Sequence, residues 1–294
     1  METLKNKIDF AVIVIVKNAN PNGDPLNGNR PRVNYDGIGE LSDVCMKRKI
    51  RNRLMQEGHA IFVQSDDNRM EGDDYRSLRS RAEGELKKVD MKNDKKYREE
   101  ACKKWIDVRA FGQVFAYKGK GEEAGVSIGI RGPVSIHSAF SVAPVADRIS
   151  SIQITKSVSG EGDGTKRGSD TMGMKHRVDH GLYVFYGSMN PQLASKTGFT
   201  DKDAEAIKES LRTLFVNDES SARQAGTMEV HKVYWWRHKS NNGDYSSAKV
   251  HRSVRDKVKA KLEEPKSIGD YQIPDKPEIE KDLPGLKVEI LDGE

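Results

Sequence analysis

The segment from residue 47 to residue 53 carries a concentration of positive charge that folding does not require. Its cations are Lys47, Arg48, Lys49, Arg51 and Arg53. At 100° per residue, Met46, Ile50 and Leu54 form the buried stripe of a helix, and the cations occupy its other sides. No Asp or Glu lies among the cations to form helix pairs. We therefore predict that this face binds the phosphates of a polyanion; the alternative is an ordinary solvated face.

The loop before this helix, residues 17–40, is rich in residue types that contact phosphates. It is dense in Asn, Gly, Pro and Asp, and connections this long are uncommon unless they are functional. Amide and backbone N–H groups can donate to phosphate oxygens, and glycine allows close approach; the alternative is a turn-rich surface loop. The candidate phosphate-binding residues of loop and helix are Asn20, Asn22, Gly23, Asp24, Asn29, Arg30, Ser42, Lys47, Arg48, Lys49 and Arg51.

The sequence gives little support for metal binding, cofactor binding or catalysis. His176 and His180 are four residues apart, with Asp179 beside them, and on a helix this spacing could hold zinc. We predict a strand there, so we expect no metal. His137 is interpreted as a satisfied sheet residue rather than a general base. Because no P-loop, dinucleotide fingerprint or Gly-x-Ser-x-Gly elbow occurs, we predict no cofactor and no catalytic residues.

The charge of the chain is unevenly distributed. Residues 263–294 contain ten acidic and four basic residues and so have a net charge of −6. Because the whole chain has a net charge of +5, residues 1–262 carry +11. A basic body with an acidic, proline-containing tail suits a polyanionic partner. The two cysteines form no CxxC pair, and the apolar run of residues 10–16 is too short to span a bilayer. We therefore expect a soluble cytoplasmic protein.

The elements that would position these residues alternate along the chain. Residues 8–16 are predicted as a strand buried on both sides, residues 43–57 as the basic helix, and residues 65–104 as a charged, solvent-facing insertion. A capping box from Thr200 to Asp203 predicts a second helix. Further strands are expected at 126–136, 150–158, 181–187 and 228–238. This order fits a ferredoxin-like (RRM-like) α+β core, in which Tyr234, Trp235 and Trp236 pack into the core or an interface.

Several motifs occur together in this chain: "NPNGDPLNGNRPRV", "SDVCMKRKIRNRL", "DVRAFGQVFA", "IRGPVSIHSAFS" and "TMGMKHRVDHGLYVFYG". With these motifs the chain resembles the backbone subunit of the CRISPR surveillance complex Cascade, closest to its type I-C version, in the RAMP superfamily. The resemblance implies a ferredoxin-like palm, a helical finger insertion and a β-hairpin thumb. The implied bounds are 8–58, 105–144 and 181–262 for the palm, 59–104 for the fingers, 145–180 for the thumb and 263–294 for the acidic tail.

The resemblance also implies a function. Copies of such a protein assemble head to tail along one CRISPR RNA, in an interface that does not close into a ring. The guide, and not the protein, pairs with target DNA. Implied partners are CRISPR RNA, target DNA, other copies of the chain and other Cascade subunits (repeat-handle-binding, large and small), with no membrane. The implied thumb contacts are Lys166, Arg167, Met172, Met174, Lys175 and Arg177, with Val158 as a further apolar wedge. The alternative is an endoribonuclease that processes precursor CRISPR RNA.

Overall fold

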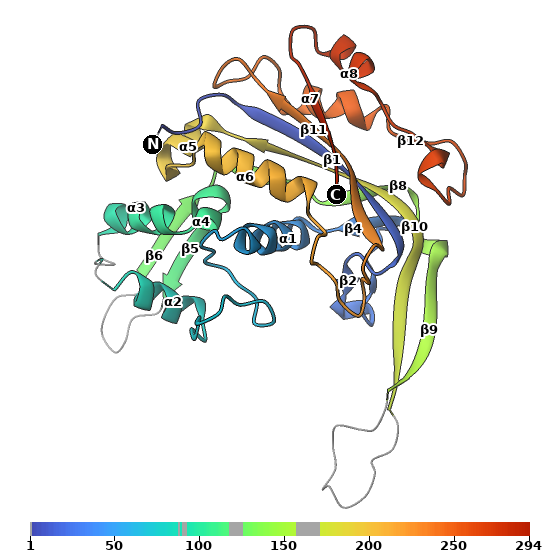
Figure 1. Ribbon diagram of the computed structural model, residues 1–294, viewed down its shortest axis with the longest axis horizontal. Coiled ribbons are helices and arrows are strands. Elements are labelled where there is room, and N and C mark those ends of the chain that lie inside the picture. Colours follow the sequence, from blue (N-terminus) through green and yellow to red (C-terminus); the bar gives the residue numbers. More distant parts are fainter. Residues whose placement is uncertain (1, 88, 90–92, 118–125, 157–170) are drawn as a thin grey trace, which may run out of the picture.

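The computed structural model describes residues 2–87, 89, 93–117, 126–156 and 171–294 (Figure 1). Its main sheet is antiparallel, with the strand order β14-β11-β1-β10-β8-β4, while β7 and β9 pair with other parts of β10. The bounds of these strands are β1 Ile8–Ala19, β4 Ile38–Leu41, β7 Val134–Ile136, β8 Ala139–Pro144, β9 Ile149–Lys156, β10 Thr171–Met189, β11 Met228–Arg237 and β14 Glu289–Asp292.

Strand β1 lies in the middle of the sheet and is buried on both faces, as its run of apolar, β-branched residues predicts. Phe10 and Val12 pack into one hydrophobic cluster, and Ala11 and Ile13 pack into a second cluster on the opposite face. The aromatic run in β11 divides in the same way. Trp235 joins the first cluster, whereas Tyr234 and Trp236 join the second, which confirms that these rings belong to the core.

Two helices with predicted positions cover the first face of the sheet. Helix α1 (Asp43–Gln56) begins after the N-cap Ser42, and its stripe of Met46, Ile50 and Leu54 is fully buried, as predicted. Helix α6 (Asp201–Arg212) begins with the predicted capping box at Thr200. The short helices α4 (Ile106–Phe111) and α5 (Pro191–Thr197) lie beside them. Helix α7 (Ser247–Arg255) covers the opposite face (Figure 1).

The C-terminal segment is part of the folded core, and the prediction of an extended tail over the surface is wrong. After η3 (Ile268–Asp270), β13 (Tyr271–Gln272) pairs with β12 (Lys259–Ala260). Helix α8 (Lys276–Asp282) then packs near α7, and β14 adds an edge strand beside β11. Ile279, Leu283, Leu286 and Val288 are at most 1% exposed. The prolines and acidic residues concealed this apolar set, which the sequence analysis missed.

The charged insertion also has a core of its own and is not merely solvent-facing. Helices α2 (Leu78–Glu85) and α3 (Asp94–Lys104) pack against a hairpin of β5 (Gly112–Tyr117) and β6 (Val126–Arg131). Phe62, Tyr97, Trp105 and Phe115 meet in this small core. Residues 105–117 and 126–131, assigned to the palm from sequence, therefore pack largely with the insertion. The single strand expected at 126–136 is two strands, β6 and β7, in different sheets.

Strand β10 is far longer than the predicted strand at 181–187. Its inner half pairs with β1, β7 and β8, and its outer half pairs with β9 beyond the edge of the body. We call residues 149–156 and 171–178 the arm; it projects from the body in Figure 1. The loop of residues 17–40 is also structured. β1 continues to Ala19, and β2 (Gly23–Asp24), the 3-10 turn η1 (Pro25–Asn27), β3 (Arg30–Pro31) and the start of β4 follow.

Candidate nucleic-acid interface

The polar residues of the loop between β1 and α1 mainly hold the loop in its own shape. The Asn22 side-chain oxygen accepts from the Ser42 N–H at 2.9 Å, which ties the loop to the first turn of α1. The Asn20 amide, 3% exposed, donates to the Asn29 carbonyl at 2.7 Å. A Cβ at Gly23 would lie 2.0 Å from the Asn29 side chain. A side chain at Gly23 would thus collide with Asn29, and the Asn20 amide nitrogen and the Asn22 side-chain oxygen are already used in bonds within the loop and to α1.

Arg30 connects this loop to the arm. Its guanidinium donates to the Ser151 hydroxyl at 2.8 Å, and that hydroxyl lies 2.8 Å from Nδ1 of His176 on the neighbouring strand. Burial and the charge of Arg30 both lower the pKa of His176. The predicted residues Asn22, Arg30 and Ser42 therefore lie in one continuous surface that runs from the start of α1 to the base of the arm.

The arm presents different side chains on its two faces. Because directly opposed residues of an antiparallel pair share a face, the register Met174↔Gln153 and His176↔Ser151 puts Met174 on the face that Arg30 contacts. Met172 lies on the same face, two residues away. The two methionines are 70% and 57% exposed. This face therefore offers free apolar side chains next to the loop.

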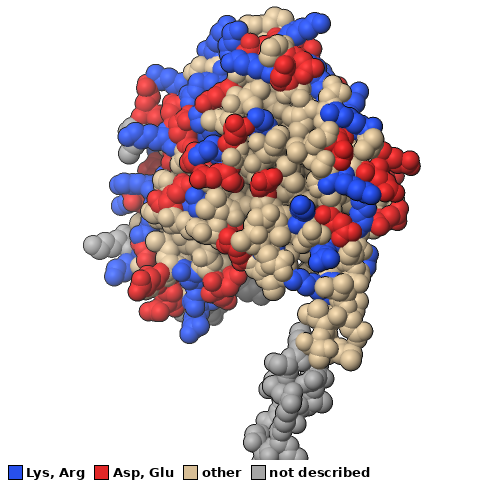
Figure 2. Space-filling model, turned by 45° about the vertical axis from the view of Figure 1, so that its right-hand side comes forward, with Lys and Arg blue, Asp and Glu red and all other residues tan. Residues whose placement is uncertain are grey.

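The predicted thumb cations lie on the other face of the arm. Lys175 is opposite Ile152, and Arg177 is opposite Ser150, so both point away from the methionine face. The Arg177 side chain is 40% exposed and lies 4.0 Å from Asp179. The set of thumb contacts predicted from sequence is thus split between two faces. Val158, Lys166 and Arg167 lie outside the described residues. On the side of the arm that Figure 2 shows, few charged side chains are visible, and Lys and Arg side chains gather at its base.

Helix α1 does not present a face of unpaired cations, and this premise of the sequence analysis is wrong. Lys47 pairs with Asp43 at 3.0 Å and Arg53 with Glu57 at 3.5 Å, both at (i, i+4) just beyond the cationic segment. Lys49 is 4% exposed and pairs with Asp218, and its burial lowers its pKa. Of the predicted helix contacts, Lys47 remains partly open to solvent, with its side chain 27% exposed.

Arg48 and Arg51 hold the charged insertion to the body. The carboxylate of Asp107, 1% exposed, accepts from Arg51 Nε at 2.9 Å and from the N–H groups of Phe62 and Val63 at 2.8 and 3.1 Å. Arg48 donates to the Val63 carbonyl at 2.7 Å. These two cations therefore face a buried junction with the insertion rather than an open helix face. Sequence reasoning missed Asp107, whose only signal is a carboxylate in the apolar run "WIDVRAF".

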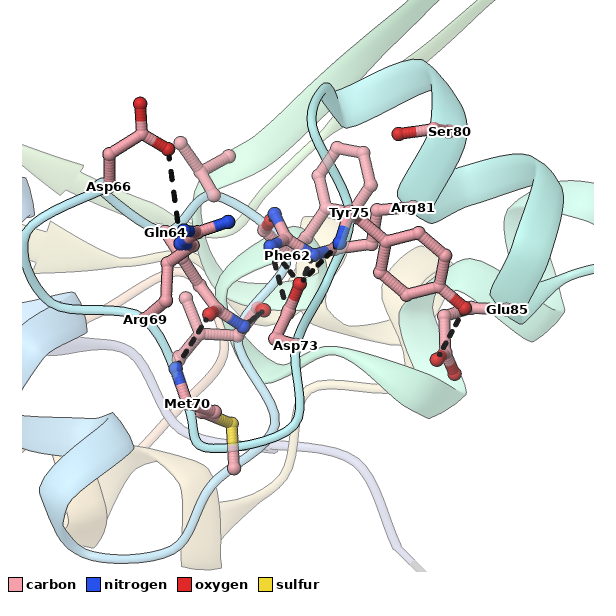
Figure 3. Close-up of polar contacts among 12 residues, drawn as sticks. Phe62, Gln64, Asp66, Arg69, Met70, Asp73, Tyr75, Ser80, Arg81 and Glu85 are labelled. Carbon is pink, nitrogen blue, oxygen red and sulfur yellow. Dashed lines mark hydrogen bonds and ion pairs between the residues drawn. The ribbon is translucent and has the colours of Figure 1, made fainter.

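Arg81 completes this junction from the side of the insertion (Figure 3). It donates to the Phe62 carbonyl at 2.8 Å and makes a two-pronged contact with Asp73, at 2.8 Å from Nη2 to each carboxylate oxygen. Charged side chains thus bind all four backbone polar groups of Phe62 and Val63. We call this set, with Arg48, Arg51, Arg81 and Asp107, the 62–63 junction. Its charges serve folding, because buried backbone groups need partners.

His176, His180 and Asp179, the residues considered for zinc, form no metal site in the structure. His176 and His180 lie on strand β10, as predicted for that segment, and Asp179 accepts from Ser150 at 2.7 Å. In the described part of the chain, no three His, Cys, Asp or Glu side chains come together in a group that could hold a metal ion. Among the described residues, no helix is long and apolar enough to cross a membrane.

Comparisons with known proteins point to one family. The model of the family "CRISPR-associated protein Cas7" matches residues 6–275. A "CRISPR-associated protein Cas7" of Haloferax volcanii is 24% identical over 220 residues, which cover 70% of this chain and 63% of that relative, less than two thirds of its length. These matches confirm the family that the sequence motifs indicate; the type I-C subtype stays a prediction.

The fold also resembles chains in solved assemblies. One belongs to a "CRISPR RNA-guided surveillance complex, pre-nicking", with a TM-score of 0.43, 14% identity and coverage of 78% of each chain. Another belongs to a "CRISPR RNA-guided surveillance complex", with a TM-score of 0.39, 17% identity, and coverage of 78% of this chain and 68% of the other.

Proposed function

Since this chain belongs to the Cas7 family of CRISPR-associated proteins, we propose that it binds CRISPR RNA as the backbone subunit of a Cascade complex of type I-C. Copies assemble head to tail along the guide, and the guide pairs with target DNA in antiviral defence. The further partners are the repeat-handle-binding, large and small subunits. The protein works without a cofactor, in the cytoplasm.

The observation that carries this proposal is the joining of loop and arm through Arg30, Ser151 and His176. It puts the exposed Met172 and Met174 beside the loop that leads into α1. Apolar side chains next to cationic and polar groups can contact both the bases and the backbone of a strand. In this proposal the guide lies along this surface, and the methionines wedge between nucleotides. Arg30 and Lys47 are the cations that contact phosphate.

We also propose that the body is a ferredoxin-like palm, the arm a thumb and the insertion a set of fingers. The strands β1, β8, β10 and β11 stand in the spatial order β11-β1-β10-β8, and helices follow β1 and β10 in sequence on one face. This is the arrangement that a β-α-β-β-α-β unit requires. The fingers then comprise about residues 59–131, and the C-terminal segment belongs to the palm.

A second candidate function is an endoribonuclease of the same superfamily. The observation that favours it is that the rings of His137 and Tyr186 both lie near His251, at centroid distances of 5.5 and 5.1 Å. Histidine and tyrosine can act as general acid and base. We favour the non-catalytic function because these groups lie on the sheet face that carries α7, away from the loop and α1.

The test is whether the protein purified from its host carries RNA. The proposal requires strong absorbance at 260 nm that resolves to RNA of uniform length on a denaturing gel. Protein free of RNA, and unable to bind CRISPR RNA added later, would contradict it. Incubation with precursor CRISPR RNA, with and without magnesium, separates the two candidates. Specific cleavage that His137→Ala abolishes would favour the endoribonuclease.

A further inference from the structure

A cavity of about 430 Å³ opens on the sheet face that carries α7, opposite the face that carries α1. Its principal lining residues are His137, Phe140, Val142, Val184, Tyr186 and Arg255. The proposed function makes no use of this cavity. Its volume is in the range of sites that bury small ligands, which begins at about 300 Å³.

The floor of the cavity is built by strand register. Val184 of β10 lies directly opposite Phe140 of β8, so their side chains share one face. The His137 N–H donates to the Tyr186 carbonyl at 2.8 Å, which brings these two residues side by side. Arg255, at the end of α7, and Val258 close the cavity from above. Three rings and one guanidinium therefore converge from β8, β10, α7 and the connection between β7 and β8.

A buried polar cluster holds the inner wall in place. His251, 5% exposed, donates from Nε2 to the Gly187 carbonyl at 3.1 Å, and its ring contacts those of His137 and Tyr186. Behind it lies Asp9, fully buried, with one carboxylate oxygen 3.6 Å from the same nitrogen. His238 and Lys7 contact the other carboxylate oxygen, at 2.8 and 3.0 Å. Because these contacts fix α7 to β1 and β10, the cavity is preformed.

The groups left open in the cavity suit one class of ligand. Phe140 is 44% exposed, and His137 beside it is also exposed, so flat ring surface faces solvent. The Arg255 side chain is 57% exposed, and its ion pair within the described part of the chain is a long one, 3.4 Å from Nε to the neighbouring Asp256. Aromatic surface favours a planar base, and a guanidinium with free Nη groups favours a phosphate.

We propose that this cavity binds one unstacked nucleotide of a single-stranded nucleic acid. The base packs against Phe140, Tyr186 and His137, and Arg255 contacts the adjoining phosphate. This inference rests on the proposed function, in that the protein works on a nucleic-acid strand. It adds a contact on the side of the sheet opposite α1. There the protein can bind a nucleic-acid segment other than the one held by the loop and arm.

The test is photo-crosslinking of the full-length protein to single-stranded probes of about twelve nucleotides. One probe is RNA with 4-thiouridine, and the other is DNA with 4-thiothymidine, so the two arms identify the kind of strand. Mass spectrometry then locates the crosslinked residues. The inference expects crosslinks at residues 137–140 or at Tyr186, in addition to those at the loop and arm.

Variants on the exposed rim of the cavity measure its contribution. Phe140→Ala should weaken binding of the preferred probe by about fivefold or more, as expected when one base loses its stacking partner. Arg255→Ala should reduce the salt dependence by about 0.7 in slope, the value of one phosphate contact on a single strand. Matched controls are Leu262→Ala, 55% exposed elsewhere, and Arg252→Ala, exposed on α7 outside the cavity lining. Both controls should bind as the wild type does.

The results separate this inference from the proposed function. Crosslinks confined to the loop and arm, with unchanged binding by both rim variants, would overturn the cavity alone. Absence of binding to either probe by the wild-type protein would overturn both. Crosslinking of the cavity to a second copy of the protein, and not to the probe, would show that a side chain of a neighbour fills it. Shortening of the RNA probe that depends on His137 would overturn simple binding in favour of cleavage.

Discussion

Helix α1 and the arm use their side chains in opposite ways. On α1, Lys49 pairs with Asp218, and Arg51 pairs with Asp107, so these cations bind carboxylates of the same chain. On the arm, Met172 and Met174 stand free in solvent although apolar side chains favour burial. The comparison shows that a run of like charges can be a structural device, whereas apolar side chains on a projecting hairpin can stay exposed and available for contacts.

The difference follows from where each element lies. Helix α1 is packed between the sheet, the insertion and the 213–223 region, so its long cationic side chains reach carboxylates and carbonyls on every side. The arm pairs only with itself beyond the edge of the sheet, so its outer side chains have few neighbours. Substitutions on α1 should therefore act on folding, and substitutions on the arm should act on binding.

The largest effect is expected for Arg51→Glu. It replaces the partner of buried Asp107 by a second carboxylate and should lower the free energy of unfolding by about 3–5 kcal/mol, the cost of breaking a buried pair. Urea denaturation would measure this. The control is Arg98→Glu, whose side chain is 48% exposed and 3.6 Å from Asp94, and which should change stability by less than about 1 kcal/mol. Equal, small effects would show that the 62–63 junction does not stabilise the fold.

A smaller loss is expected for Lys49→Met. The substitution leaves the Asp218 carboxylate, only 13% exposed, without its lysine partner, but Arg223 Nε still donates to it at 3.1 Å. The free energy of unfolding should therefore fall by about 1–3 kcal/mol, the cost of weakening a buried polar contact. Lys47→Met is the matched change on the same helix, because it removes a partly exposed (i, i+4) pair worth about 0.3–0.5 kcal/mol. If Lys47→Met lowers the free energy of unfolding as much as Lys49→Met does, burial does not make the Lys49 pair more stabilising than the Lys47 pair.

For the arm, Met172→Ser combined with Met174→Ser should leave the free energy of unfolding within about 0.5 kcal/mol of wild type. The same variant should lose the regular protection pattern in nuclease footprinting of bound CRISPR RNA. Ile152→Ser with Ile154→Ser is the matched control, since these side chains are 40% and 37% exposed on the opposite face. Loss of the footprint in the isoleucine variant alone would place the strand on the other face of the arm.

The smallest effect is expected from pH at the base of the arm. Burial, Arg148 and Lys17 lower the pKa of His180, although Asp270 raises it. Because the unfolded chain binds a proton more readily, the contribution of His180 is present above its ordinary pKa of about 6.5 and is lost as the pH falls through its folded pKa. Urea unfolding at about pH 7.5 and about pH 5.5 should show lower stability in acid.

His180→Gln provides the check on this pH effect. It should reduce the difference between the two pH values without abolishing it, because His176, His231 and His251 have pKa values lowered in the same direction. An unchanged difference in this variant would show that His180 does not contribute.

Local pattern was enough to predict the elements that build the palm. The apolar run of β1, the stripe of α1 after Ser42 and the capping box at Thr200 all specify structure within a few residues, so neighbours in sequence suffice. The alternation in β11 likewise separates Trp235 from Trp236. The family, too, was recognisable from short motifs in order.

Which partner each cation of α1 and the loop binds was decided only by the tertiary structure. Asp107 and Asp218 lie 56 and 169 residues from the cations that they bind, and no periodicity links such positions. The Arg30 contact to Ser151 spans 121 residues in the same way. Sequence determines how many cations a helix carries and which stripe it buries. Whether those cations meet solvent, a strand of RNA or a buried carboxylate depends on which distant segments the fold brings against them, because electrostatic partners are chosen by distance in space.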